Sequence, residues 1–299
     1  MNSECTRRDA LIWACSSIAS ARWVSASSLL PAAAPIAAVR DYERSNGGHL
    51  GLYAENIATG AKLTWRADER FVMCSTFKAS LAACVLLRVD RGQDALETLV
   101  HYRRADLQRF YAPVAQANLR KGFLSVGEMC KAAVERSDNA CANLLLARIG
   151  GPLALTAFWR EIGDEVTRLD DNEPLLNRTP PGGVRNTTTP TAMASTLRRL
   201  VLGRVLSEVS RRTLTAWLVD CQTRGNRLRA GLPRGWMIGD KTGNNGTDAA
   251  GDIAVAWPKA DVPIIITVYT RGGSPTSAQF DAVFAGVGKF VGEHLGQRT

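Results

Sequence analysis

The sequence predicts an α/β protein: one antiparallel sheet, formed by both ends of the chain and flanked by helices, into which an all-helical lobe is inserted. Two observations predict this class. Apolar and polar residues alternate near both ends of the chain, as they do in half-buried strands. Between these segments the apolar residues follow helical spacing instead. Strands that share a pattern at both ends are joined most economically in a single sheet.

The strands and helices are expected in a simple order along the chain. A hairpin over residues 48–65 turns at Ala58, Thr59 and Gly60. Helices follow from about residue 76 to residue 218, with Gly and Pro at the breaks. Strands return within residues 236–271. A last helix over 277–295 carries large apolar residues at i, i+3 and i+4 spacing, namely Phe280, Val283, Phe284, Val287 and Val291.

The chain after residue 34 is long enough to bury one sizeable core. We expect residues 35–299 to form one domain, with an α/β lobe from 35–70 and 219–299 and a helical lobe from 71–218. The segment at about 168–186 is rich in Pro, Gly, Asn and Asp and has no hydrophobic period, so it is predicted to be a long ordered loop. Grooves between lobes commonly hold sites, and loops of this length usually have a function.

The first 34 residues predict an export signal. Arg7 and Arg8 precede a modestly apolar stretch, which is similar to a twin-arginine signal although Arg22 interrupts it. Cleavage is expected after Ala26 or Ala34; a helix that stays attached is the alternative. We expect the mature protein to be periplasmic or secreted. No later segment is apolar enough to span a membrane.

Charge and composition exclude several classes of function. The formal net charge of +9 falls to +8 without residues 1–34, and the arginines are scattered rather than interleaved with aromatics, so nucleic acid is not an expected partner. Five of the seven cysteines remain after residue 34, without C-x-x-C spacing. The histidines His49, His101 and His294 are isolated and show no ligand spacing, so no metal is predicted.

Ser75 and Lys78 form a candidate nucleophile pair at the start of a predicted helix. At this spacing the two side chains share one helix face, about 5 to 6 Å apart at Cβ. A serine hydroxyl is a weak nucleophile until a neighbour takes its proton, which a desolvated lysine can do. The helix start adds backbone N–H groups that stabilise an oxyanion. Alone, however, such a pair favours a capping serine beside an exposed lysine.

Two further motifs change that interpretation. Residues 137–139 read Ser-Asp-Asn between two helical segments, and residues 241–243 read Lys-Thr-Gly on a predicted strand. Ser-x-x-Lys, Ser-Asp-Asn and Lys-Thr-Gly, in this order, are the motifs of class A β-lactamases and penicillin-binding proteins. Over roughly residues 36–295 the chain resembles this superfamily, and the β-lactamase/transpeptidase-like fold that the resemblance implies agrees with the α/β class above.

The predicted loop separates the branches of the superfamily. Glu173 and Asn177 match the class A pattern Glu-x-x-Leu-Asn, which a transpeptidase does not need. They fit a base that holds the water for hydrolysis of an acyl-enzyme, a contribution of about 10²–10⁴ in rate. The chain therefore resembles a class A serine β-lactamase, which hydrolyses penicillins and cephalosporins and confers resistance. The alternatives are a D,D-peptidase and a β-lactam sensor without turnover.

The resemblance implies catalytic roles for the matching residues. Ser75 is the implied nucleophile, and Lys78 shares its hydrogen-bond network. Ser137 is implied to relay a proton to the departing lactam nitrogen. Glu173, with Asn177, is implied to hold the deacylating water, and both Lys78 and Glu173 are candidates for the base of acylation.

The resemblance also implies how a small β-lactam, the expected partner of a monomeric enzyme, is bound. Lys241 and Thr242 are expected to receive the substrate carboxylate, together with Arg227, whose guanidinium fork suits that group. The backbone N–H groups of Ser75 and Asn244 are the implied oxyanion hole. The full set of implied binding residues is Tyr111, Asn139, Arg227, Lys241, Thr242, Gly243 and Asn244, with Asn139 on the substrate amide and Tyr111 at the rim.

The neck of the loop departs from the family. Asp171 and Asn186 stand where an arginine–aspartate pair is common, so that salt bridge is absent. We expect an Asp-to-Asn hydrogen bond in its place and a looser loop. A looser loop admits bulkier side chains, so appreciable cephalosporin hydrolysis with slowed deacylation is expected.

The cysteines depart from the family as well. Asn245 stands at the position that would pair with Cys74 in the disulfide of one carbapenemase group, and Ala82 at the position that would pair with Cys130 in another common disulfide. Neither bridge can form. We therefore predict reduced cysteines, most of them buried in the core.

Overall fold

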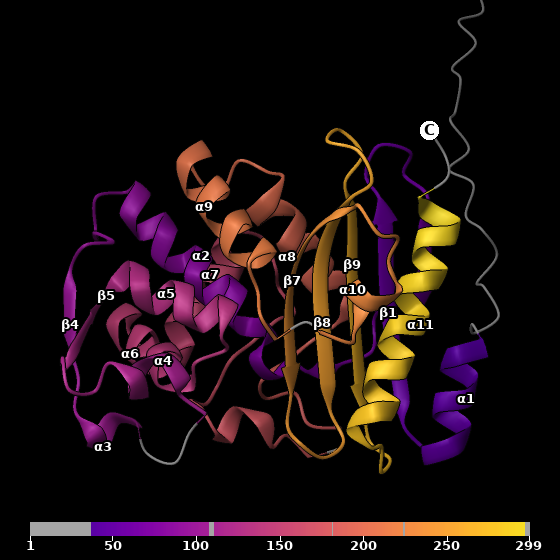
Figure 1. Ribbon diagram of the computed structural model, residues 1–299, viewed down its shortest axis with the longest axis horizontal. Coiled ribbons are helices and arrows are strands. Elements are labelled where there is room, and N and C mark those ends of the chain that lie inside the picture. Colours follow the sequence, from indigo (N-terminus) through magenta and orange to yellow (C-terminus); the bar gives the residue numbers. More distant parts are fainter. Residues whose placement is uncertain (1–36, 108–110, 181, 224, 297–299) are drawn as a thin grey trace, which may run out of the picture.

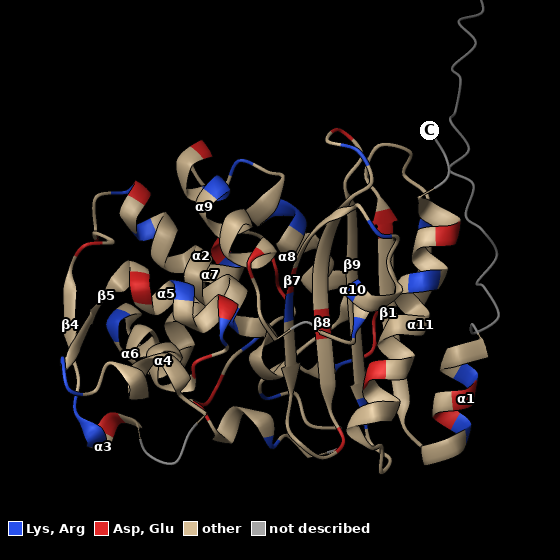
Figure 2. Ribbon diagram, viewed as in Figure 1, with Lys and Arg blue, Asp and Glu red and all other residues tan. Residues whose placement is uncertain are grey.

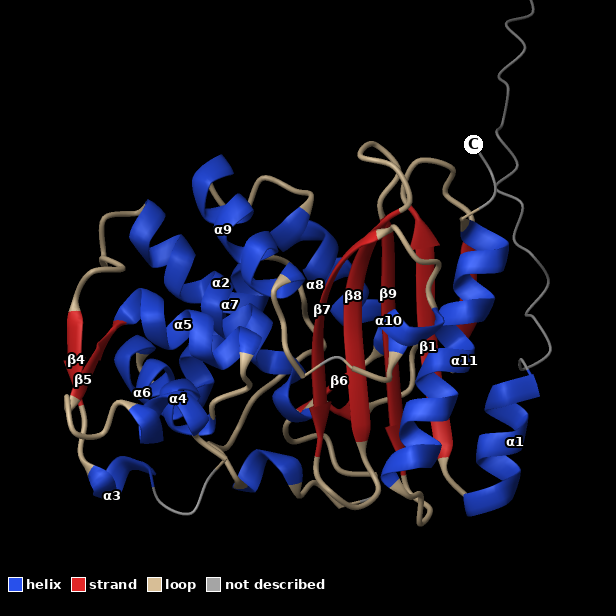
Figure 3. Ribbon diagram, viewed as in Figure 1, coloured by secondary structure: helices blue, strands red, loops and turns tan. Residues whose placement is uncertain are grey.

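A five-stranded antiparallel sheet lies at the centre of the α/β lobe in the computed structural model, which describes residues 37–107, 111–180, 182–223 and 225–296. The predicted export signal lies outside the described residues. The strand order across the sheet is β2-β1-β9-β8-β7 (Figure 3). The strands are β1 (His49–Asn56), β2 (Lys62–Trp65), β7 (Met237–Asn244), β8 (Ala250–Trp257) and β9 (Ile264–Arg271).

Both ends of the chain meet in this sheet, as predicted. β1 pairs with β2 through the hairpin and with β9 along its other edge, so Leu52 lies opposite both Trp65 and Val268. The hairpin turns through Gly60, whose φ of +72° costs glycine little. β8 is buried along its whole length, because helices cover both faces of the sheet (Figure 1).

One face of the sheet is covered by α11 (Ser277–Leu295), the predicted last helix, with the short α10 (Leu228–Gly231) beside it (Figure 1). The five large apolar residues predicted to face the core in α11 are all buried. Gly231 lets α10 lie against α11, because a Cβ there would meet the Ala285 carbonyl oxygen at 1.8 Å. The i, i+3, i+4 pattern therefore identified the packed face correctly.

The opposite face packs against α8 (Pro190–Val201) and the helical lobe. The centre of that lobe is α2 (Phe77–Asp90), in which residues 77–87 are all buried. One apolar core runs from these helices to Ile253 and Val255 of β8, so the two lobes are packed together. The remaining helices are α3 (Arg104–Leu107), α4 (Pro113–Ala117), α5 (Val126–Glu135), α6 (Asn139–Ile149), α7 (Pro152–Glu161) and α9 (Glu208–Val219).

Several small elements are not predicted from the sequence. Helix α1 (Ala37–Asn46) buries only Val39 and Tyr42, too few to give a helical pattern. Two paired ribbons consist of strands of two or three residues, which are too short to show alternation. These pairs are β3 (Phe71–Val72) with β6 (Thr187–Thr188), and β4 (Leu99–His101) with β5 (Phe123–Ser125).

The predicted long loop connects α7 to β6, and among its described residues the 3₁₀ turn Leu175–Asn177 is the only regular element. Pairing of β6 with β3 fixes the end of the loop next to the segment that leads into Ser75.

In the view of Figure 2, Lys and Arg are interspersed with Asp and Glu over both lobes. Among the described residues no single helix meets the length and hydropathy of a membrane span; only the bent pair α6 and α7 does, by length and composition alone.

Candidate active site

The edge strand β7 faces the helical lobe (Figure 1), and a cavity of about 340 Å³ is lined by residues from both. The residues that line it come from five separate segments of the chain: Ser75, Ser137, Asn139, Arg227, Thr242 and Asn244 are among them. Tyr111, also on its wall, is 58% exposed and lies at the rim. The structure thus brings the predicted motifs together at one place.

Ser75 lies in the 3₁₀ turn Cys74–Thr76 that precedes α2, rather than within the α-helix itself. The turn is held against the sheet by a 3.0 Å hydrogen bond between the hydroxyls of Thr76 and Tyr269. Cys74, at φ +47°, is one of four non-glycine residues in the left-handed region within the described part of the chain. Gly243 is required opposite this turn, because a Cβ there would come within 2.7 Å of the Ser75 backbone nitrogen.

Lys78 is fully buried and surrounded by oxygen atoms. Its Nζ lies 2.9 Å from Ser75 Oγ, 2.9 Å from the carbonyl oxygen of Ser137 and 3.3 Å from Glu173 Oε1, and it also donates to Asn139 Oδ1. Burial lowers the pKa of this lysine, while the Glu173 carboxylate opposes the shift. The amine is therefore easier to deprotonate than an ordinary lysine and is placed to take the proton of Ser75.

Glu173 comes from the loop and is also buried. Its Oε1 lies 3.5 Å from Ser75 Oγ, and its Oε2 accepts a 2.7 Å hydrogen bond from Asn177 Nδ2. Asn143, which sequence reasoning missed, holds the glutamate by its backbone: Asn143 Nδ2 donates to Glu173 O and Asn143 Oδ1 accepts from Glu173 N, both at 3.0 Å. Its spacing of four from Asn139 in α6 is the signal that places it on the same helix face.

Ser137 joins the two buried lysines. Its Oγ lies 3.3 Å from Lys78 Nζ and 3.2 Å from Lys241 Nζ. Its backbone has φ +54°, a strained conformation for a residue with a Cβ and one that clusters at functional sites. Asp138, the middle residue of the motif, faces the other way and caps α6 by accepting from the Cys141 backbone N–H at 2.9 Å. Its part in the motif is therefore structural.

Lys241 is fully buried on β7, and its Nζ donates to the Thr242 carbonyl oxygen at 2.7 Å. Burial lowers the pKa of this lysine to about 8, and the positive charge of Lys78 acts in the same direction. Thr242 Oγ1 lies 2.7 Å from the hydroxyl of Thr223, a further residue of the site that sequence reasoning missed. A lysine and two hydroxyls here suit a substrate anion.

The register of the sheet exposes the Asn244 backbone toward the cavity. Asn245 N–H donates to the Ala249 carbonyl oxygen at 3.0 Å, and hydrogen-bonded pairs alternate along an antiparallel ladder. The Asn244 N–H is therefore directed away from β8, to the free edge of the sheet where Ser75 lies. The strand passes close to the Ser75 backbone nitrogen, the other donor expected for an oxyanion hole, since a Cβ on Gly243 would lie 2.7 Å from it.

Comparisons with known proteins agree with this geometry. The profile of the β-lactamase enzyme family matches residues 34–295. The ancestral class A β-lactamase of the last common ancestor of Gram-negative bacteria is 51% identical, with 85% of this chain and 97% of that chain covered and a TM-score of 0.82. A β-lactamase from Xanthomonas campestris pv. campestris is 46% identical, with 86% and 96% covered and a TM-score of 0.82.

The chain belongs to the class A β-lactamases. These enzymes hydrolyse the β-lactam amide bond and confer antibiotic resistance, and the family assignment agrees with the prediction from Glu173 and Asn177. A variant of the ancestral enzyme gives the same result at 50% identity over 87% of this chain and 98% of that chain, with a TM-score of 0.83. The fold predicted from the sequence is thereby confirmed.

Arg227 of this β-lactamase is 8% exposed and lies on the wall of the cavity. Its Nη1 donates to the carbonyl oxygens of Gly243 and Gly251 at 2.8 and 3.1 Å, and its Nε lies 3.5 Å from Asp281 Oδ1. The side chain also lies over the ring of Phe284, 5.3 Å from its centroid. The guanidinium is thus held rigidly beside Lys-Thr-Gly.

The neck of the loop contains the expected Asp-to-Asn contact: Asn186 Nδ2 donates to Asp171 Oδ2 at 2.8 Å. The neck also contains ion pairs that the sequence analysis overlooked. Arg185 lies 2.7 Å from Asp171 Oδ1, and Arg168 pairs with Asp170. At the two positions where the family commonly has a salt bridge, Asp171 and Asn186 form a hydrogen bond. Arg185 and Arg168 nevertheless form ion pairs with Asp171 and Asp170.

All five cysteines of the described residues are free and buried, as predicted. Cys74 Sγ lies 3.9 Å from the Ala249 carbonyl oxygen, and burial strongly raises the pKa of its thiol. Such a thiol is inert toward metals and oxidants. Among the described residues there is also no group of three or more His, Cys, Asp or Glu side chains that could hold a metal ion.

Proposed function

We propose that Ser75 is the nucleophile of β-lactam hydrolysis and that Lys78 and Glu173 are the two groups able to take its proton. Lys78 Nζ lies 2.9 Å and Glu173 Oε1 3.5 Å from Ser75 Oγ, both within reach of a hydroxyl proton. The Ser75 and Asn244 N–H groups stabilise the tetrahedral oxyanion, and each such donor contributes about 10²–10³ in rate.

The second half of the proposed reaction is hydrolysis of the acyl-enzyme. Glu173 accepts a proton from the attacking water, and Asn177 orients both water and carboxylate through its amide. Asn177 Nδ2 donates a hydrogen bond to Glu173. The buried Oδ1 of Asn177 has no hydrogen-bond partner among the described residues, so it is suited to accept a hydrogen bond from a water molecule. The Glu173–Asn177 pair is the single observation that supports hydrolysis of the acyl-enzyme rather than its accumulation.

The substrate is proposed to lie with its carboxylate against Lys241, Thr242 and Arg227. Ser137, between the two lysines, passes a proton to the lactam nitrogen as the amide bond breaks. Asn139 contacts the side-chain amide of the substrate, and Tyr111 covers the rim. No step of this reaction uses a cofactor.

Nitrocefin hydrolysis at substoichiometric enzyme tests the proposal. A β-lactamase gives sustained turnover, whereas a D,D-peptidase or a β-lactam sensor releases one equivalent of product per enzyme and stops. Ser75→Ala is the control and should give neither phase. A single burst from the wild-type protein would overturn the proposal.

We also propose that the Asp–Asn neck widens the substrate range to bulky cephalosporins, with slowed deacylation. The double variant Asp171→Arg, Asn186→Asp restores the arrangement common in the family. It is expected to lower turnover of an oxyimino-cephalosporin several-fold relative to benzylpenicillin. Burst kinetics with both substrates measure this, and an unchanged ratio would contradict it.

Export is proposed from residues 1–34, which lie outside the described residues. Twin arginines, an apolar stretch and small residues before Ala26 and Ala34 support a cleaved signal and a periplasmic or secreted enzyme. The N-terminal sequence of the enzyme recovered from a periplasmic fraction tests this. We further propose a monomer, which light scattering after gel filtration measures directly.

A further inference from the structure

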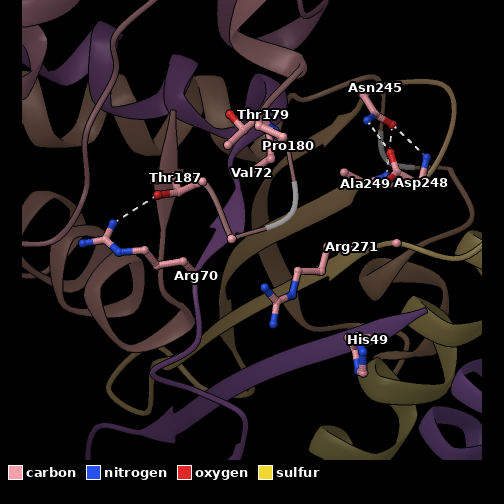
Figure 4. A pocket seen from close by; sticks show the side chains of 13 residues that line it. His49, Arg70, Val72, Thr179, Pro180, Thr187, Asn245, Asp248, Ala249 and Arg271 are labelled. Carbon is pink, nitrogen blue, oxygen red and sulfur yellow. Dashed lines mark hydrogen bonds between the residues drawn. The ribbon is translucent and has the colours of Figure 1, made fainter. Parts of the chain in front are cut away.

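A second cavity, of about 290 Å³ (Figure 4), is lined in part by the active-site loop and shares no lining residue with the catalytic one. We call it the rear cavity. Its walls come from the loop, from the turn between β7 and β8, and from the ends of β1, β3 and β9. Its lining includes Arg70, Arg271, His49, Asp248, Asn245 and Val72.

Arg70 contributes a guanidinium without an acidic partner. Its Nη1 donates to the Val166 carbonyl oxygen at 3.1 Å and to Thr187 Oγ1 at 3.0 Å. No carboxylate of the described residues lies within ion-pair distance of it. These neutral contacts fix the side chain in place and leave its charge uncompensated.

Arg271 contributes a second guanidinium that is only partly satisfied. Glu69 pairs with its Nη2 at 2.6 Å, and the guanidinium lies over the ring of Phe71, 5.2 Å from the centroid. Its Nε is buried and has no hydrogen-bond partner among the described residues. His49 stands directly across from Arg271 in the β1–β9 pairing, and both line the cavity; Arg70 lines it too, but its guanidinium is directed away from Arg271, to Thr187 (Figure 4).

The opposing charge is limited. Among the described lining residues Asp248 is the only acidic one, and it is bonded within its own turn, to Asn245 Nδ2 at 2.8 Å and Thr247 Oγ1 at 3.1 Å (Figure 4). Val72 and Ala249 supply an apolar wall. A cavity with fixed guanidinium groups and an apolar wall matches a small molecule that has an anionic end and an apolar body.

We propose that the rear cavity binds a small organic anion, whose carboxylate or phosphate group is held by Arg271 and attracted by the uncompensated charge of Arg70, while its apolar part lies against Val72. Guanidinium forks favour both of these oxyanions over neutral groups. The cavity volume limits the ligand to a molecule smaller than a typical drug. Asn245, on the cavity wall, also donates to the Asn177 carbonyl oxygen at 3.4 Å, so the site lies directly behind the proposed deacylation pair.

Calorimetric titration of the whole protein with benzoate, inorganic phosphate and the uncharged analogue benzamide tests the site without any turnover. Binding of benzoate or phosphate, but not of benzamide, is expected. Binding of only one anion identifies carboxylates or phosphates as the ligand class. Absence of binding by both anions, or equal binding of benzamide, would overturn the proposal, whatever the outcome for the catalytic residues.

Single substitutions test which side chains bind the anion. Arg271→Gln should weaken binding by about tenfold, the loss expected for one charged hydrogen bond, whereas Arg70→Gln, which removes a charge that does not bond the anion, should weaken it by about threefold. Glu69→Gln frees Arg271 and should tighten binding several-fold, a gain that misfolding cannot produce. Arg212→Gln, in an exposed pair with Glu208 on α9, is the matched control and should change nothing.

The catalytic pocket also attracts carboxylates, so it needs its own control. Thr242→Val removes a hydroxyl from that pocket and should leave unchanged the binding component that Arg271→Gln weakens, whatever it does to binding in the catalytic pocket. Binding that is lost in Thr242→Val but kept in Arg271→Gln would place the anion in the catalytic pocket and contradict the proposal.

Discussion

The two halves of the catalytic site are built in different ways. Around Ser75, the side chains stand on a turn before α2, on the start of α6 and on the edge strand β7, and both lysines are fully buried in the core. Glu173 stands on a loop and is held by side-chain hydrogen bonds from Asn143 and Asn177. We infer that acylation depends on the packed fold, whereas deacylation depends on a small number of polar contacts.

Lys78→Ala disrupts the half of the catalytic site around Ser75 and has the largest expected effect on activity. Because it removes a general base that contacts Ser75 Oγ at 2.9 Å, kcat/KM for benzylpenicillin should fall by about 10²–10⁴. Stopped-flow acylation measures the loss. Lys121→Ala, an exposed lysine, is the control. Acylation within threefold of wild type would mean that Lys78 is not needed as a base.

Asn143→Ala disrupts the half of the catalytic site that holds Glu173, while leaving the nucleophile Ser75 in place. It removes two hydrogen bonds to the Glu173 backbone, each contributing about 1 kcal/mol, so deacylation should slow by about 30-fold. Acylation should change by less than about threefold. Pre-steady-state kinetics separate the two steps. Asn118→Ala, whose amide bonds a carbonyl in α4, is the matched control, and equal slowing of both steps would contradict the comparison.

The pH profile of kcat/KM tests the role of Lys241 in the half of the catalytic site around Ser75. Lys241 has a pKa of about 8, so it is charged below that pH and neutral above it. Loss of its charge removes an attraction for the substrate carboxylate, so kcat/KM should decline above about pH 8. Lys241→Arg keeps the charge and should move this decline to higher pH. An identical profile in the variant would assign the decline to another group.

Arg227→Ala has the smallest expected effect of the four. The guanidinium lines the cavity without contacting Ser75, so the KM for penicillins should rise by about five- to tenfold while kcat changes little. Its hydrogen bonds to Gly243 and Gly251 are also lost, at a cost of about 1–2 kcal/mol in the free energy of unfolding. Steady-state kinetics at a temperature where the variant is folded measure the KM, and an unchanged KM would exclude Arg227 from carboxylate binding.

The sequence predicted the catalytic cluster well because its motifs are local. Ser75 and Lys78 are three residues apart, and Lys241 to Gly243 are consecutive on a strand. Periodicity alone identified the sheet and α11, because their buried faces are long.

The contacts that support the cluster were less predictable. Asn143 and Thr223 act through pairs with residues 30 and 19 positions away, which no local pattern shows. The strain at Cys74 and Ser137 depends on tertiary packing. The ion pair of Arg185 with Asp171 at the neck of the loop was not predictable either, because the two residues are 14 positions apart in a segment without a hydrophobic period.

The separation of the two halves is tested most directly by mass spectrometry of Glu173→Gln after mixing with benzylpenicillin. The account predicts that Ser75 is acylated at close to the wild-type rate and that the acyl-enzyme then persists, since the base for the attacking water is gone while Lys78 remains. A variant that fails to acylate within the time of many wild-type turnovers would show that Glu173 is needed for both steps, and would contradict the division of the site into a core half and a loop half.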